Sequence, residues 1–229
     1  MAKSTVTTLD LRKTGKVLTA SDVARLVHRF RNLTSLDFSY NTYISDNHLL
    51  QLSPLAPTLT VLRLRGCRVT DDGIVTFLES RGDNWKLTEL DVSAVRKDGS
   101  GCVGDAALVA ITSRCPALRI LEMGYRSRLT DDAARSLSQL TRLVRLDLSL
   151  CSLLTGAVCG PLSRLCDLRW LDLSATGLRG DGLQILAGGL ERIEELVLRH
   201  LDQVSVETLE AFVMRDNSSL KVLDLSYCG

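Results

Sequence analysis

Acidic side chains recur at one position of a repeated leucine pattern. The pattern is typified by Leu143-Val-Arg-Leu146-Asp-Leu148-Ser-Leu-Cys151, in which the aspartate stands between two leucines. The residues at this position, in chain order, are Asp10, Asp37, Arg63, Asp91, Glu122, Asp147, Asp172, Val197 and Asp224. A row of carboxylates would attract a basic segment of a partner protein. The alternative is that Leu-Asp-Leu-Ser is simply the ordinary sequence of such a repeat.

Trp170 stands two residues before one of these aspartates, at a position that alternates with buried leucines, so we expect it to be exposed outside the core. Arg145 holds the same position one repeat earlier, and Leu150 and Tyr125 follow neighbouring strands. A tryptophan beside an arginine and apolar side chains has the composition of a binding hot spot. His200 is more readily explained as a solvent-facing side chain than as a ligand. The candidate partner-binding residues are therefore Trp170, Arg145, Tyr125, Leu150, Asp147, Asp172, Glu122, Tyr40 and His200.

Histidine and cysteine do not form a catalytic or metal-binding set. The three histidines fall at unrelated positions of the repeat and cannot converge in an elongated array. The seven cysteines are odd in number and include no C-x-x-C pair, so neither a disulfide framework nor a zinc ribbon is indicated. Five of them share two repeat positions where we expect buried thiols: Cys67, Cys151, Cys228, Cys115 and Cys166. We expect a protein that is not an enzyme and that holds no metal and no cofactor.

One segment has the literal form of a dinucleotide-binding loop. It reads Gly99-Ser-Gly101-Cys-Val-Gly104, and Glu122 lies 18 residues beyond it. The glycines do not follow the preceding strand directly, and the repeat already accounts for Gly104 as part of a helix start and for Glu122 as a strand residue. We therefore expect a polar insertion loop at about residues 94–102 and no bound dinucleotide.

The leucine pattern occurs nine times, with its first apolar positions 25 to 31 residues apart. A threonine or serine that can cap a helix follows most of these strands, and an apolar position comes four residues later. Such a period, with a strand, a turn and a capped helix in each repeat, is typical of a leucine-rich-repeat solenoid. We predict an α/β horseshoe in which a parallel concave β-sheet of about nine strands faces convex helices, forming a single domain over residues 1–229.

Three segments carry a resemblance to a known family: Val69-Thr-Asp-Asp-Gly-Ile74, Ser113-Arg-Cys115-Pro-Ala-Leu118 and Leu225-Ser-Tyr-Cys228. They resemble the cysteine-containing subclass of leucine-rich repeats. That subclass is familiar from the substrate-binding half of F-box ubiquitin-ligase receptors and from other scaffolds and assembly subunits, so the resemblance implies protein binding. No F-box-like segment precedes the first repeat. The subclass usually has cysteine or asparagine where this chain has Arg126, Thr176 and Leu201, and we expect the turns there to be less well locked.

Charge and hydropathy narrow the environment of the protein. The chain has 28 basic and 27 acidic residues, so its overall field favours neither nucleic acid nor an anionic membrane. No apolar run is long enough to cross a membrane, and the N-terminus lacks a signal-peptide core. The cysteine usage favours a reducing, cytoplasmic compartment, including a cytoskeletal or organellar assembly. The leucine pattern reaches both ends of the sequence, so we expect an open C-terminal sheet edge, and either the sequence is part of a longer chain or neighbouring subunits cover its ends.

These observations favour a non-catalytic scaffold that binds a protein partner through the concave face, as a subunit of a larger assembly. The first alternative is the substrate-recognition module of a ubiquitin ligase whose F-box lies elsewhere. The second is a leucine-rich GTPase activator that uses an exposed arginine, for which Arg12, Arg65 and Arg199 are available. This alternative is disfavoured because such activators have a longer repeat.

Overall fold

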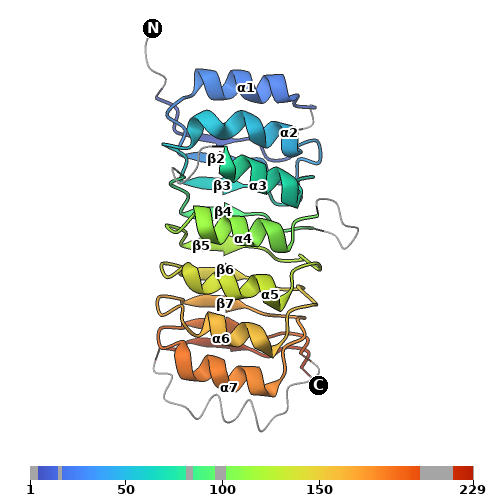
Figure 1. The fold of residues 1–229 in the computed structure, drawn as a ribbon, viewed down its shortest axis with the longest axis vertical. Coiled ribbons are helices and arrows are strands. Elements are labelled where there is room, and N and C mark those ends of the chain that lie inside the picture. Colours follow the sequence, from blue (N-terminus) through green and yellow to red (C-terminus); the bar gives the residue numbers. More distant parts are fainter. Residues whose placement is uncertain (1–4, 15–16, 81–84, 96–101, 202–218, 229) are drawn as a thin grey trace.

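The structure is a computed structural model that describes residues 5–14, 17–80, 85–95, 102–201 and 219–228. Nine strands of three residues each form one sheet in sequence order, and every neighbouring pair is parallel and in register. This architecture confirms the predicted α/β solenoid (Figure 1). The strands are β1 Thr8–Asp10, β2 Ser35–Asp37, β3 Val61–Arg63, β4 Glu89–Asp91, β5 Ile120–Glu122, β6 Arg145–Asp147, β7 Trp170–Asp172, β8 Glu195–Val197 and β9 Val222–Asp224.

Helical segments cover one face of this sheet (Figure 1). Four repeats contain an α-helix of nine or ten residues, and three have a shorter α-helix joined to a 3₁₀ turn. The longer helices are α1 Ala20–Arg29, α3 Asp71–Glu79, α4 Asp105–Arg114 and α7 Gly180–Gly189. The shorter segments are α2 Asp46–Leu49 with η1 Leu50–Leu55, α5 Asp131–Ala134 with η2 Arg135–Gln139, and η3 Gly156–Val158 with α6 Cys159–Leu162. The helix expected after Val204 lies outside the described residues.

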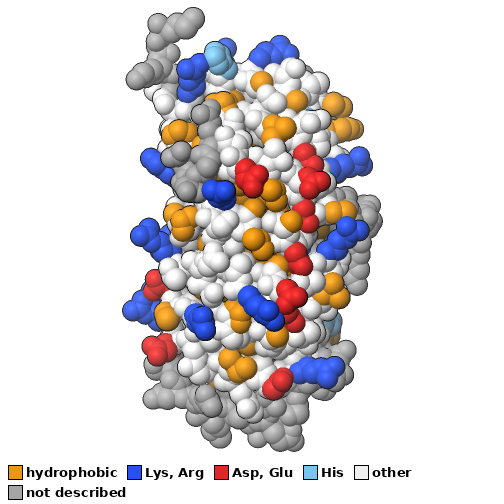
Figure 2. Space-filling view, viewed as in Figure 1, with side chains coloured by type: hydrophobic (Ala, Val, Ile, Leu, Met, Phe, Trp, Pro, Cys, Tyr) orange, Lys and Arg blue, Asp and Glu red, His pale blue; other side chains and the backbone are white. Residues whose placement is uncertain are grey.

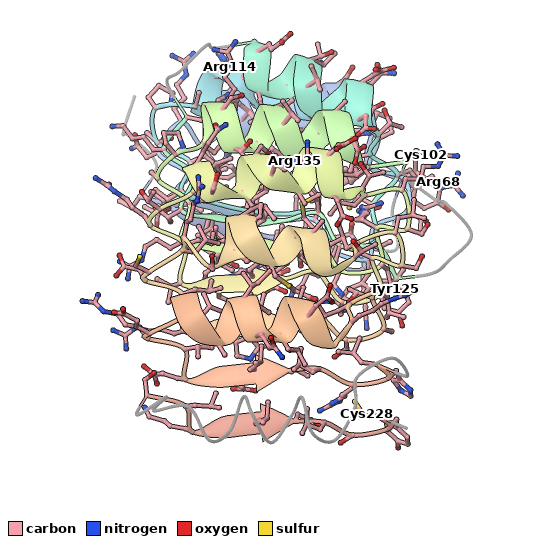
Figure 3. All side chains as sticks on the ribbon, turned by 60° about the horizontal axis from the view of Figure 1, so that its bottom comes forward. Arg68, Cys102, Arg114, Tyr125, Arg135 and Cys228 are labelled. Atoms are coloured by element: carbon pink, nitrogen blue, oxygen red, sulfur yellow. The ribbon has the colours of Figure 1, made fainter. Side chains whose placement is uncertain are left out.

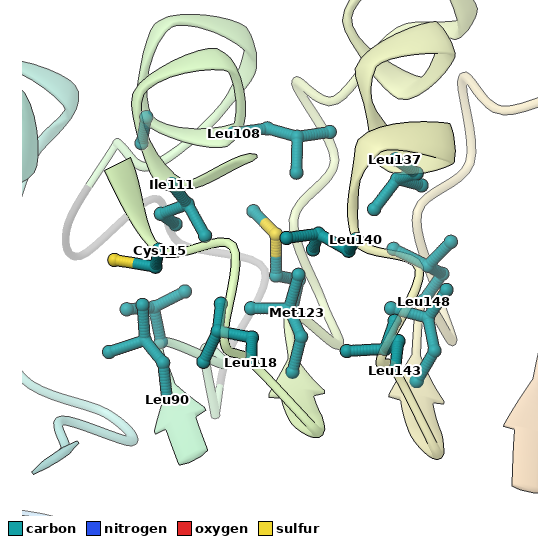
Figure 4. Packing of buried hydrophobic residues seen from close by; sticks show 14 of the residues in the cluster. Leu90, Leu108, Ile111, Cys115, Leu118, Met123, Leu137, Leu140, Leu143 and Leu148 are labelled. Carbon is teal, nitrogen blue, oxygen red and sulfur yellow. The ribbon is translucent and has the colours of Figure 1, made fainter. Parts of the chain in front are cut away.

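A continuous apolar core fills the space between the sheet and the helices. The central leucine of each strand from β2 to β8 is at most 1 % exposed, because its side chain points toward the helices while its two strand neighbours point away. Figure 4 shows how Leu121's neighbours Leu118 and Met123 pack with Leu108 and Ile111 of α4. Since each repeat packs on the next, the core runs along the array.

Three helix starts are capped by a predicted threonine, and aspartates from the preceding repeat bind several of the N-cap residues. Thr19 caps α1 in a capping box with Asp22. Asp131, the first residue of α5, accepts the backbone N–H of Thr155 at 2.9 Å and its hydroxyl at 2.6 Å. Asp46, Asp71 and Asp105 make equivalent contacts to the next repeat. The first-turn aspartates therefore tie each helix start to the one before it, a link that the sequence pattern did not reveal.

The turns after the strands are locked by side chains that donate to a carbonyl of the preceding repeat. The Sγ of Cys67 lies 3.3 Å from the carbonyl oxygen of Phe38, and Cys151 and Cys228 make equivalent contacts. Arg126 donates to the carbonyl of Val92 and is only 3 % exposed. The expectation of a weaker turn at Arg126 is therefore wrong, because the guanidinium replaces the thiol as the donor.

The other two positions that lack the usual residue are occupied differently. The hydroxyl of Thr176 donates to the carbonyl oxygen of Leu173 at 2.7 Å, and Leu201 is 1 % exposed. The prediction of buried thiols is wrong at two of the five positions: Cys228 is only partly buried, and Cys166 is exposed whereas Cys115 is buried. It follows that Cys115 and Cys166 do not share an environment even though they stand close to equivalent strand positions.

Part of the expected insertion loop lies outside the described residues, namely 96–101. Ala94 is buried and Cys102 is partly buried at its two ends. The glycines of the dinucleotide-like motif at positions 99 and 101 belong to that undescribed segment. Among the described helices, none has the length and apolar character needed to span a membrane.

Candidate interaction surface on the sheet face

The outer face of the sheet, turned away from the helices, carries aligned rows of side chains; we call it the sheet face. In the register of the strands, Arg145 is paired with Trp170 and Asp147 with Asp172. The candidate residues on β5, β6 and β7 therefore lie side by side: Glu122, Arg145, Asp147, Trp170 and Asp172. Neighbouring strands are about 4.8 Å apart, so these five side chains form one continuous patch, the Trp170 patch.

A stacked triad lies at the centre of this patch. The guanidinium carbon of Arg145 lies 3.4 Å from the ring centroid of Trp170, which is a cation–π contact. The Nε of the same arginine lies 2.6 Å from Oε1 of Glu122. Trp170 is consequently half-buried beneath the guanidinium, and the expectation of a fully exposed ring is corrected. The triad holds three side chains of three strands in one arrangement.

The aspartates of the acidic row have a structural role in the turns. Asp147 Oδ1 accepts the backbone N–H of Ser149 at 2.8 Å, and Asp172 accepts that of Ser174 at the same distance. Asp37, Asp91 and Asp224 make the same contact two residues ahead. Each such aspartate therefore closes the turn that follows its strand. This supports the interpretation that Leu-Asp-Leu-Ser is part of the repeat, and it leaves the second carboxylate oxygen on the sheet face.

The acidic row is neutralised by ion pairs near its ends and much less in its middle. Arg12 pairs with Asp10 at 2.6 Å and Arg199 with Asp224 at 2.5 Å. Within the described parts of the chain, Asp91, Asp147 and Asp172 form no ion pair. The negative potential of the sheet face is therefore concentrated on β4 to β7.

Burial changes the protonation of the central carboxyl groups. Burial raises the pKa of Glu122 to about 7, with the nearby Asp147 adding to the rise and Arg145 opposing it. Burial likewise raises the pKa values of Asp91 and Asp172 above their ordinary value. At the exposed N-terminal edge, hydrogen bonds from Arg12 lower the pKa of Asp10 to about 2. The middle of the row therefore holds its negative charge at an energetic cost that a bound cation would reduce.

Four candidate residues occupy a turn position with left-handed backbone. Tyr40, Tyr125, Leu150 and His200 have φ between 55° and 65°, and Tyr227 has 64°. Non-glycine residues rarely adopt this conformation, so the backbone of this row of turns is less favourable than that of ordinary turns. Figure 3 shows Tyr125 on the same margin of the array as Cys228. The sequence placed these residues in one row but did not predict their backbone.

The nine candidates do not converge on a single point. Tyr40 follows β2, five strands from Trp170, or about 24 Å at the usual strand spacing. Its ring lies 5.3 Å from Nζ of Lys13. His200 stacks on Tyr227 with ring centroids 4.6 Å apart, near the other end of the sheet. Tyr40 and His200 therefore belong to the flanks of the sheet face, and Tyr125 and Leu150 border the Trp170 patch.

A small hollow lies on the sheet face over β1 to β3. It measures about 300 Å³, and its lining includes Arg12, Arg63 and Arg65 together with Asp10, Asp37 and Tyr40. The Nε of Arg65 is buried and has no hydrogen-bond partner within the described residues. The sequence indicated Arg65 only as an exposed arginine available to a GTPase activator, and no pattern in it predicted this hollow.

The helical face offers a second concavity. A groove of about 600 Å³ is lined by residues of α3, α4 and α5, including Val75, Val109, Asp105, Arg114 and Asp132. Figure 2 shows this side of the molecule, where hydrophobic side chains run down the middle and acidic ones gather beside them. Among the described residues, no group of three or more metal-binding side chains occurs on either face.

Comparison with known proteins supports the fold. The family described as Leucine Rich repeat matches residues 31–47, 56–78 and 216–229. The crystal structure of an internalin (inlF) from Listeria monocytogenes superimposes with a TM-score of 0.56 at 18% sequence identity, over 90% of this chain and 57% of the internalin. The chain thus spans little more than half the length of that structure. With the nine-stranded parallel sheet, these matches show that the chain has the leucine-rich-repeat fold.

Proposed function

We propose that this chain with a leucine-rich-repeat fold is a non-catalytic scaffold that binds a basic segment of a partner protein on its sheet face, centred on the Trp170 patch. Leucine-rich repeats commonly mediate protein–protein interaction. The observation that carries the proposal is the triad of Glu122, Arg145 and Trp170 beside two carboxylates that form no ion pair among the described residues.

The triad supports binding because it is already ordered. Arg145 stacks on the half-buried Trp170 and is itself paired with Glu122. Trp170 therefore loses little side-chain entropy when a partner covers it. Tryptophan and arginine are also the residues most enriched at the energetic centres of interfaces. A partner that places a lysine or arginine over Asp147 and Asp172 would gain charge-assisted hydrogen bonds there.

The finer assignments are proposals of the same kind. We place the scaffold in a larger assembly in the cytoplasm, cytoskeletal and organellar assemblies included, and treat the ubiquitin-ligase adaptor as the alternative. A GTPase activator needs an arginine that is available to the GTPase. Arg12 and Arg199 are both ion-paired to carboxylates, so they do not support this alternative. The ligase alternative would be favoured by ligase subunits among the bound proteins.

The test is affinity capture from cell lysate with quantitative mass spectrometry, using the wild-type chain and two variants. Trp170→Glu places a charge at the centre of the patch, and Ile185→Glu makes the same change at an exposed residue of α7 on the helical side. We expect Trp170→Glu to lose the captured partners and Ile185→Glu to retain them, provided both variants keep wild-type circular dichroism. Partners that persist with Trp170→Glu would contradict the sheet face as the binding site.

A further inference from the structure

Arg65 differs from the other arginines of the sheet face in its contacts. Arg12, Arg63, Arg145 and Arg199 each lie 2.5 or 2.6 Å from a carboxylate oxygen. Arg65 has no such pair within the described residues, and its Nε is buried without a hydrogen-bond partner. A buried N–H that forms no hydrogen bond is unfavourable, so the free protein leaves a donor at this point unsatisfied.

The surroundings of Arg65 set the charge of the group that could satisfy it. The hollow over β1 to β3 is lined by three arginines and two aspartates: Arg12, Arg63, Arg65, Asp10 and Asp37. One of these arginines, Arg63, is paired with Glu89, which lies beyond this lining. Arg12 and Arg63 are already engaged with carboxylates, which leaves the Arg65 guanidinium to bind an additional anion. One carboxylate balances the charge of this guanidinium, whereas a doubly charged phosphate would exceed it and face both aspartates.

We propose that the hollow at Arg65 binds one carboxylate side chain of the partner segment that occupies the Trp170 patch. This inference rests on the proposed function and adds an acidic residue to the basic partner. The guanidinium forms two parallel hydrogen bonds to a carboxylate, for which its planar geometry is suited. Rotation of the Arg65 side chain toward the ligand brings Nε to an acceptor.

The separation of the two sites predicts the spacing within the partner. Arg65 follows β3 and Asp147 ends β6, three strands away, which corresponds to about 14 Å. An extended chain advances about 3.3 Å per residue, so the residue with the carboxylate and the basic residue lie about four positions apart in the partner. The partner is therefore a segment with an acidic residue at one end and a basic residue about four positions away.

Selection from a random peptide library displayed on phage tests this spacing directly. The wild-type chain is compared with Arg65→Gln and with Arg199→Gln, which changes an arginine at the same repeat position that is paired with Asp224. We expect the wild-type chain and Arg199→Gln to enrich peptides in which an acidic and a basic residue lie about four positions apart. Arg65→Gln is expected to keep the basic preference and to lose the acidic one.

The outcomes separate this inference from the proposed function. Enrichment of basic peptides without an acidic residue, or an acidic preference that survives Arg65→Gln, overturns the inference and leaves the Trp170 patch intact. Peptides that bind regardless of Trp170→Glu overturn the proposed function.

A second measurement reads the carboxylate site without a peptide. The Nε–Hε signal of Arg65 is followed by NMR during titration with N-acetylglutamate amide, which carries one carboxylate, and with inorganic phosphate. We expect a saturable shift with the carboxylate, a weaker response to phosphate and no shift of the Arg199 signal. An Arg65 signal that does not respond, or that responds more strongly to phosphate, overturns the inference whatever the peptides show.

Discussion

Arg126 stands where three other repeats have a cysteine, and it makes the same kind of contact with a very different side chain. Its guanidinium donates to the carbonyl of Val92 from a nearly fully buried position. Burial lowers the pKa of Arg126 to about 10, so it stays charged at neutral pH. At this turn position, therefore, either a thiol or a guanidinium can donate to the preceding repeat.

The hydrogen bond from Arg126 to the carbonyl of Val92 predicts an order of stability among variants of Arg126. Arg126→Cys and Arg126→Val remove the same charge and leave side chains of similar size, but only the cysteine can donate to Val92. We expect Arg126→Cys to exceed Arg126→Val by about 1 kcal/mol in the free energy of unfolding, the usual net value of one hydrogen bond. Urea denaturation followed by circular dichroism measures the difference. Equal stabilities would show that the turn depends on packing alone.

Glu122 gives the sheet face a dependence on pH. Burial raises its folded-state pKa to about 7, above the ordinary value of 4.5 for a glutamate. A carboxyl group with a raised folded pKa contributes stability that is complete below the unfolded pKa and is lost as pH rises through the folded pKa. The raised pKa values of Asp91 and Asp172 act in the same direction.

We therefore expect the wild-type chain to lose stability between about pH 4.5 and pH 7 relative to Glu122→Gln, which does not titrate. The urea midpoints of the two proteins, measured across this range, should diverge as pH rises, with the variant becoming relatively more stable. Parallel pH profiles would mean that the pairing with Arg145 offsets the effect of burial on the pKa of Glu122.

At the scale of the element, the aspartates at the helix starts connect successive repeats. Asp131 and Asp132 are adjacent acidic residues in the first turn of α5, yet their contacts differ. Asp131 binds the backbone N–H and the hydroxyl of Thr155 in the next repeat, while Asp132 forms only an exposed ion pair with Arg135 among the contacts of the described residues. Both are acidic residues that suit the positive end of a helix, so the sequence alone does not distinguish their contacts.

This difference predicts unequal costs for two neighbouring substitutions. Asp131→Ala should lower the free energy of unfolding by about 1 to 2 kcal/mol because it removes the two hydrogen bonds to Thr155. Asp132→Ala should change it by less than about 0.5 kcal/mol, as for most exposed ion pairs. Thermal and urea unfolding of both variants provide the comparison. A double substitution with Thr155→Ala should add little to Asp131→Ala, since both remove the same contact.

At the scale of the whole molecule, the fold and the composition of the sheet face were predictable because a single repeat determines both. The leucine period fixes which residue of each strand is buried, so the sequence placed Trp170 beside Arg145 and aligned the acidic row. It could not give the stacking of Arg145 on Trp170, the left-handed turns at Tyr125 and Leu150, or the unsatisfied Nε at Arg65. These depend on side-chain conformation and on the distances between repeats, which the period does not encode.

The linear arrangement also limits how far a disturbance can spread. Each strand pairs only with its neighbours in sequence, and the core is continuous because each repeat packs on the next. Truncating Leu121, which is fully buried in β5, leaves a cavity between the sheet and the helices and should cost about 3 to 5 kcal/mol locally. In a globular domain with many long-range contacts such a loss would be shared by the whole structure.

In a repeat array stability is close to a sum of repeat and neighbour terms, so we expect Leu121→Ala to act mainly on its surroundings. Hydrogen exchange with mass spectrometry should show faster exchange in β4, β5, β6 and the adjoining helices α4 and α5. Exchange in β2 and β8 should remain close to wild type. Uniformly faster exchange along the chain would instead indicate that the array unfolds as a single cooperative unit, in which case a ligand on the Trp170 patch would stabilise the distant hollow at Arg65 as well.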